Sequence, residues 1–194
     1  MARALQNDHS VTARRSRGFT LVELMVVVAI VGVLATLAVV GYRKLIQASH
    51  VSEATGMVQN IRVAQEAYHA ETQRYANVSP SLTAYYPATP QYQVVTAWGA
   101  ACTNCTSDAQ WSDLPVHVDG PVLFGYATVA GLPGQAPPAA VMVNGSPLTF
   151  PASPATDWYV VAAAGDLDSQ PEPANTHVYT TSWSNQIFVD RDGQ

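Results

Sequence analysis

The sequence has 194 residues, of which 12% are charged and 48% are hydrophobic. This length allows one domain of ordinary size plus an appendage. Beyond Asn77 the chain carries nine acidic residues and a single basic residue, Arg191. An acidic surface repels phosphate backbones, so this composition disfavours direct nucleic-acid binding by the C-terminal part and suits cations or basic partners.

The hydrophobic excess is concentrated near the N-terminus, where residues 24–42 carry no formal charge. A helix of about 20 apolar residues spans a hydrocarbon core of about 30 Å. We therefore expect residues 19–42 to form a membrane-spanning helix. Four arginines precede this segment, whereas Arg43 and Lys44 follow it, so the positive-inside rule places the N-terminus in the cytoplasm. A simple membrane anchor is one interpretation of this pattern.

One carboxylate, that of Glu23, lies at the start of the apolar segment. A lone acid inside a membrane costs about 2.5–3.5 kcal/mol, so we expect Glu23 to have a partner and a function. The alternative is that its side chain only reaches back to the membrane surface. The sequence around it reads RGFTLVE over residues 17–23. Gly18 has no side chain and so lets another backbone approach closely, whereas a loop glycine of no consequence is the alternative.

This motif resembles the processing site of type IV pilins and of the related pseudopilins of type II secretion. The resemblance rests on the basic leader, the Gly-Phe pair, the Thr-Leu-x-Glu run and the apolar segment that follows. It implies that a prepilin peptidase cuts between Gly18 and Phe19, removes residues 1–18 as a leader, and methylates the amine of Phe19. It also implies that Glu23 pairs with the terminal amine of a neighbouring subunit and so sets the register between subunits. Many pilins have a proline where this chain has Val40, a departure that favours a minor pilin or a pseudopilin over a major subunit.

A second helical segment is expected to follow directly, over residues 43–77. Apolar residues recur there at spacings of three and four, which indicates one buried stripe. The residues of this stripe are Val51, Ala54, Val58, Ile61, Ala64 and Tyr68. Pro80 cannot continue a helix, so the segment should end shortly before it.

Residues 78–194 are predicted to form a globular head. Residues 78–120 are expected to be mostly loop, with one short strand at Tyr92–Ala97, and the runs Val122–Val129 and Asp157–Ala163 to be central strands. A short strand at Val141–Val143 and a C-terminal hairpin, Thr176–Thr181 with Gln186–Asp190, complete the prediction. The sequence therefore predicts an α+β fold in which a long N-terminal helix, membrane-spanning in its first half and amphipathic in its second, packs on an antiparallel β-sheet head, as in pilins.

The two cysteines, Cys102 and Cys105, lie three residues apart in the head. In an exported domain such a pair favours a small disulfide that fixes a loop. Free thiols, a redox-active pair or part of a metal site are the alternatives, although zinc would need two further ligands.

Two pairs of acidic residues are candidates for Ca²⁺, because hard oxygen ligands suit this cation. They are Asp166 with Asp168 and Asp190 with Asp192. Neither pair has the spacing of a complete calcium-binding loop, and solvated turn residues are the competing interpretation. We expect no other cofactor. No Ser/His/Asp or Cys/His grouping can be defined from the sequence, so we predict no catalytic residues and no enzyme.

The resemblance implies a structural subunit of a type IV pilus or related filament that serves attachment, motility or DNA uptake. The alternative within the family is a type II secretion pseudopilin. Partners would be other pilin subunits in a homo- or hetero-polymer, prepilin peptidase and an inner-membrane assembly platform. The subunit would cross the inner membrane once before assembly and belong to an extracellular or periplasmic filament afterwards. A rival from another class is a membrane-anchored extracytoplasmic enzyme or ligand-binding domain.

Overall fold

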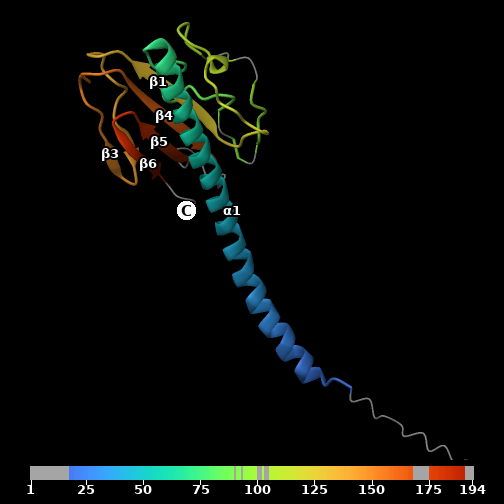
Figure 1. The fold of residues 1–194 in the computed structure, drawn as a ribbon. Coiled ribbons are helices and arrows are strands. Elements are labelled where there is room, and N and C mark those ends of the chain that lie inside the picture. The colour runs from blue at the N-terminus through green and yellow to red at the C-terminus, as the bar shows by residue number, and fades with distance from the viewer. Residues whose placement is uncertain are drawn as a thin grey trace, which may run out of the picture. The chain divides into compact units, whose positions relative to one another are not determined.

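The computed structural model describes residues 18–89, 91–92, 94–99, 102, 105–167 and 175–190. The chain divides into two compact units, Met1–Gly41 and Tyr42–Gln194 (Figure 1). One α-helix, α1 (Leu21–Thr72), contributes to both units. Its sequence contains no proline, which permits an uninterrupted ladder of backbone hydrogen bonds over 52 residues.

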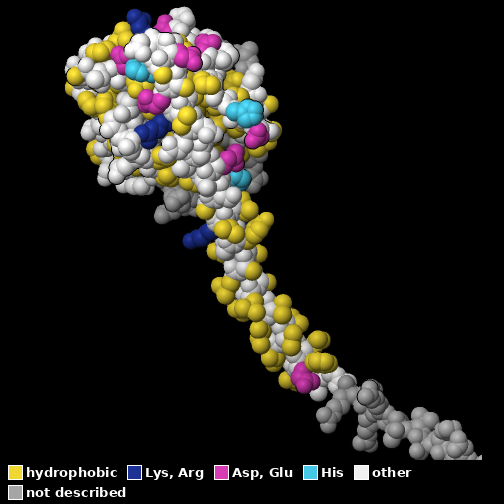
Figure 2. All heavy atoms as spheres, viewed as in Figure 1, with side chains coloured by type: hydrophobic (Ala, Val, Ile, Leu, Met, Phe, Trp, Pro, Cys, Tyr) yellow, Lys and Arg dark blue, Asp and Glu magenta, His cyan; other side chains and the backbone are white. Residues whose placement is uncertain are grey.

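The first unit consists, in its described part, of the beginning of α1 and the residues just before it. All of its described side chains are exposed, and Figure 2 shows hydrophobic side chains covering the visible face of this part of the helix. By length and composition the helix is able to cross a membrane. A helix that is apolar on every side needs an apolar environment all around it, which this unit alone does not provide.

In the second unit, the remainder of α1 packs across one face of a β-sheet (Figure 1). The predicted apolar stripe is confirmed, because its members are buried apart from the half-buried Tyr68. The buried residues of α1 are Val51, Ala54, Met57, Val58, Ile61, Ala64 and Gln65. They meet Tyr126, Tyr159 and Val161 of the sheet in one hydrophobic core.

The helix ends at Thr72, earlier than the predicted end at residue 77. Gln73 adopts a φ of 60°, in the left-handed region, which no α-helix continues through. Its N–H donates to the carbonyl of His69 at 2.8 Å, and the Thr72 hydroxyl donates to the carbonyl of Tyr68 at 2.8 Å. These local hydrogen bonds satisfy carbonyls of the last turn and replace the helical continuation.

The sheet has four antiparallel strands in the order β1-β4-β5-β6. Their bounds are Gly125–Gly131 for β1, Trp158–Gly165 for β4, Thr176–Thr181 for β5 and Ser184–Asp190 for β6. A separate hairpin joins β2 (Val141–Val143) to β3 (Ser146–Leu148), and a 3-10 helix, η1, covers Trp111–Asp113. The α+β prediction, with a long helix on an antiparallel sheet, is confirmed.

Strand β4 is buried on both faces, which explains its continuous apolar sequence. Alternate side chains, beginning with Tyr159, face α1. The others, beginning with Trp158, belong to a second core that includes Val141 of β2 and Phe150. The sheet is thus the middle layer between α1 and the β2–β3 hairpin.

Three strand predictions need correction. The run predicted as a central strand at Val122–Val129 becomes β1, which begins three residues later and lies at the edge of the ladder. The segment Tyr92–Ala97 contributes, among its described residues, only an isolated bridge between Thr96 and Val122. Strand β3, which pairs with β2, is absent from the predicted strands. The predicted C-terminal hairpin is confirmed, with a turn of two residues where four were expected.

Candidate functional site

The start of α1 is fixed by reciprocal hydrogen bonds between Thr20 and Glu23. The carboxylate Oε2 of Glu23 accepts from the backbone N–H of Thr20 at 2.9 Å and from its hydroxyl at 2.7 Å. In return the Thr20 hydroxyl oxygen accepts from the backbone N–H of Glu23 at 3.2 Å. This arrangement is a capping box, which satisfies N–H groups that have no partner within the helix.

The capping role was missed in the interpretation of the sequence, although its signature is present. A Thr three residues before a Glu, directly ahead of an apolar run, is a known start signal for a helix. Glu23 therefore has a structural role within its own chain. Both donors of Thr20 contact Oε2, and no described group donates to Oε1. A carboxylate has about four lone-pair sites, so Glu23 can accept a further donor while it caps the helix.

Gly18 and Phe19 precede the helix and are exposed, Phe19 to 83%. A Cβ built on Gly18 would meet no atom within 4 Å. Both residues of this peptide bond are therefore free of packing contacts with the described part of the chain. Among the described residues, no cation forms an ion pair with Glu23.

Cys102 and Cys105 form a disulfide, with their Cα atoms 5.6 Å apart. The side chains of both cysteines are half-buried. Like Trp98, they pack against the core that α1 shares with the sheet. The bond holds part of the long segment between α1 and β1 against this core, which is a structural role.

The calcium candidates are only partly described, since Asp168 and Asp192 lie outside the described residues. Asp190 accepts a hydrogen bond from the backbone N–H of Asn144 at 2.7 Å. Asp166 directly follows β4, and Asp190 is the last residue of β6. The pairing register places both at the same end of the sheet, with β5 between them. Two strand spacings are about 10 Å, which is too far for one ion to bind both directly. Among the described residues no group of three acidic, His or Cys side chains could hold a metal ion.

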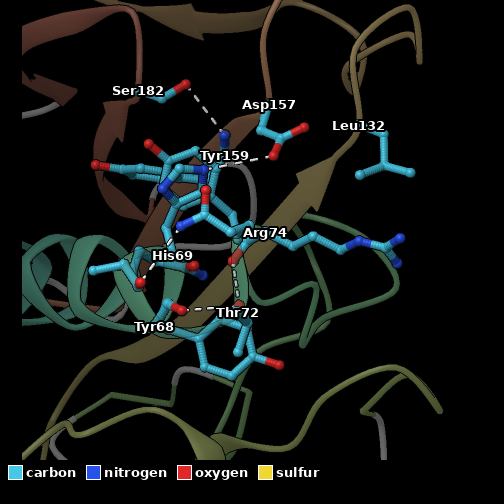
Figure 3. Close-up of polar contacts among 12 residues, drawn as sticks. Tyr68, His69, Thr72, Arg74, Leu132, Asp157, Tyr159 and Ser182 are labelled. Atoms are coloured by element: carbon cyan, nitrogen blue, oxygen red, sulfur yellow. Dashed lines mark hydrogen bonds and ion pairs between the residues drawn. The ribbon is translucent and has the colours of Figure 1, made fainter.

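Among the described residues, the side chains most similar to a catalytic triad are His69, Asp157 and Ser182 (Figure 3). They line a cavity of about 460 Å³. The Nε2 atom of His69 lies 3.5 Å from Oδ2 of Asp157. Ser182 Oγ instead accepts from the backbone N–H of Tyr159 at 3.2 Å, and no hydrogen bond joins it to His69 within the described chain. A nucleophile needs a base within hydrogen-bonding reach, and this arrangement does not supply one to Ser182.

The neighbouring polar groups connect the end of α1 to the sheet. Glu66 accepts hydrogen bonds from the hydroxyls of Tyr75 and Tyr159 at 3.2 and 3.1 Å, and the Tyr75 ring stacks on His69 with centroids 4.4 Å apart. Burial, and then the Glu66 carboxylate, raises the pKa of Tyr75 to about 12. These tyrosines therefore stay protonated as donors, and the network stabilises the packing of the helix end.

Comparison with known proteins bears on the N-terminal segment. Residues 13–39 match the family model described as the prokaryotic N-terminal methylation motif. The chain is 43% identical over 63 residues to the type IV major pilin protein PilA of Myxococcus xanthus. The chain carries the N-terminal segment of the type IV pilin and pseudopilin family. That match covers 32% of this chain and 29% of the M. xanthus pilin.

Two further relatives are a type IV fimbrial protein and a type II secretion protein. The type IV major fimbrial protein FimA of Dichelobacter nodosus is 43% identical over 47 residues, which cover 24% of this chain and 29% of the relative. The type II secretion system core protein G of Pectobacterium carotovorum is 33% identical over 79 residues, or 41% of this chain and 51% of the relative. The matched segments thus span 29% to 51% of the length of these relatives. No solved structure matches it.

Proposed function

We propose that this protein is a structural subunit of a type IV pilus or a related filament, polymerised through the apolar part of α1. One observation carries the proposal: residues 21–46 form a helix exposed on every side, with a single carboxylate near its start. The head has a hydrophobic core of its own, so this surface is not needed to fold it. A membrane before assembly and neighbouring helices after it both supply the apolar surroundings the helix requires.

Processing between Gly18 and Phe19 by a prepilin peptidase supplies a counter-ion for Glu23. The cut creates an amine on Phe19, which is then methylated. Because Oε1 of Glu23 is left open by the capping box, the carboxylate accepts the amine of a neighbouring subunit without uncapping its own helix. A paired carboxylate and ammonium in apolar surroundings are far cheaper than either alone, so subunits gain stability when their register brings the two groups together.

The subunit crosses the inner membrane once, with its N-terminus in the cytoplasm, until an assembly platform transfers it to the filament. The orientation follows from the arginines before the apolar segment. The filament is a pilus for attachment, motility or DNA uptake. A type II secretion pseudopilin is the second candidate, and the match to core protein G over 79 residues favours it.

The proposal is tested by the mass of the mature N-terminus after expression with a prepilin peptidase. We expect a chain that begins with methylated Phe19. Gly18→Ala should block the cut, whereas Gly32→Ala is the matched control, since a Cβ at either glycine meets no atom within 4 Å. An intact Met1, or a cut after Tyr42, would contradict the proposal and favour a membrane-anchored enzyme or binding domain. Sheared surface filaments that contain the chain distinguish a pilus from a pseudopilin.

A further inference from the structure

A cavity of about 470 Å³ opens at the beginning of the second unit. Its walls come from four parts of the head: the first turns of α1 in that unit, Tyr92 in the long segment between α1 and β1, the residues just before β1, and the residues after β4. The lining residues are Tyr42, Arg43, Ile46, Gln47, His50, Tyr92, Leu123, Asp166 and Leu167. Its volume lies in the range of small-molecule sites, and none of the roles assigned above uses it.

The position of Tyr42 and Arg43 in the sequence limits how far they can lie from the apolar segment. Tyr42 follows Val40, near the end of the apolar segment, by two residues, and two residues reach at most about 7 Å in any conformation. The headgroup layer on each side of a bilayer is about 5–8 Å thick. When the apolar segment spans the membrane, Tyr42 and Arg43 therefore lie in this layer or beside it.

The lining combines one cation with aromatic and apolar surface. The Arg43 side chain is exposed and makes no hydrogen bond or ion pair with the described residues. Its planar guanidinium matches the oxygens of a phosphate in a two-pronged geometry. Tyr42 and Tyr92, exposed to 66% and 41%, are of the type that concentrates at membrane–water interfaces.

The apolar part of the lining suits the glycerol region of a lipid rather than a free ion. Ile46 is 40% exposed at the cavity, while Leu123 is buried beneath it. The side-chain amide of Gln47 donates to the carbonyl of Leu167 at 3.4 Å, which joins α1 to the segment after β4 and closes one wall. His50 and Asp166 are the other ionisable groups that line the cavity.

We propose that this cavity binds the phosphate-bearing headgroup of a membrane phospholipid, with the Arg43 guanidinium as the phosphate ligand. The inference rests on the proposed function, because only a membrane-spanning subunit brings the cavity to the headgroup layer. It extends that function by giving the waiting subunit a specific lipid contact, which the subunit exchanges for protein or solvent when it enters the filament.

The test uses the full chain in nanodiscs made of equal parts of phosphatidylethanolamine and a phosphate-free galactolipid. Native mass spectrometry counts the lipids retained after release from the disc. Arg43→Gln removes the phosphate ligand. Lys44→Gln is the matched control, because it removes the same charge from the adjacent residue, which does not line the cavity. Both side chains are exposed, so circular dichroism should show an unchanged fold.

We expect the wild type and Lys44→Gln to retain phosphatidylethanolamine in preference to galactolipid, and Arg43→Gln to lose this preference about tenfold. An equal loss in both variants, or no preference in the wild type, overturns the inference and leaves the proposed function intact. Displacement of the lipid by millimolar inorganic phosphate in detergent would identify a free oxyanion as the ligand and also overturns it. A chain that fails to enter nanodiscs at all overturns the membrane-anchored function as well.

Discussion

Substitution of Glu23 by Gln separates the two roles of this side chain. A glutamine amide oxygen still accepts from the Thr20 N–H, so the capping box is kept, but the negative charge is lost. If the carboxylate pairs with the amine of a neighbouring subunit, the variant leaves that amine unpaired in apolar surroundings. Removal of one partner of a buried ion pair costs about 3–5 kcal/mol, which corresponds to at least about a hundredfold in the assembly equilibrium.

Thr20→Ala provides the opposite control. It removes the hydroxyl that accepts from Glu23 N–H at 3.2 Å and donates to Oε2 at 2.7 Å, yet leaves the charge in place. The loss of a cap costs about 1 kcal/mol, so we expect filament yield to change only about fivefold. Yield is measured by shearing filaments from cells with matched amounts of mature subunit. Wild-type yield from Glu23→Gln would refute the pairing and leave Glu23 with the capping role alone, and a loss no larger than that of Thr20→Ala would also contradict a buried ion pair.

Four further substitutions test the stability of the head. In Gly131→Ala the new Cβ would lie 2.3 Å from a ring atom of Trp158, so we expect a loss of about 1–3 kcal/mol and a lower melting temperature. Gly56→Ala, on an open face of α1, should instead gain about 1 kcal/mol, and a gain at both sites would be inconsistent with this packing. Gln65→Ala removes buried hydrogen bonds of 2.8 to 2.9 Å and leaves a backbone N–H unpaired, which should cost about 3 kcal/mol in denaturant unfolding. Because the folded-state pKa of Tyr75 is raised from 10.0 to about 12, its contribution to stability should be complete below pH 10 and disappear as pH rises through 12. Tyr75→Phe should remove that part of the alkaline loss, and an identical pH profile would argue against the shift.

The sequence predicted those elements whose burial pattern is determined locally. The apolar stripe of α1 and the wholly apolar run of β4 each have one plausible packing, and both were found. The run from Val122 was harder, because its first three side chains are buried without belonging to a strand. Hydrophobicity reports burial and does not report backbone pairing, so the beginning of β1 and its edge position could not be derived.

The candidate site was predictable to a similar extent. The proposed roles of Gly18, Phe19 and Glu23 rest on a motif in consecutive residues. The same residues contain the Thr-x-x-Glu signature from which the Thr20 cap could have been predicted. The network of Glu66, Tyr75 and Tyr159 was not, since it joins the end of a helix to a strand more than ninety residues later. The cavity beside Arg43 likewise depends on segments that only the fold brings together.

The absence of charged side chains in α1 from residue 24 to residue 42 has an energetic consequence for assembly and disassembly under the proposed function. Lipid hydrocarbon tails and leucine side chains of neighbouring helices are nearly equivalent apolar surroundings for this part of α1. Transfer of the helix from the bilayer to the filament therefore changes its hydrophobic free energy little. The sign of the transfer free energy depends on the few polar groups of the helix and on the work done by the assembly machinery. The proposed function therefore implies that a subunit released from a filament can return to the membrane without refolding.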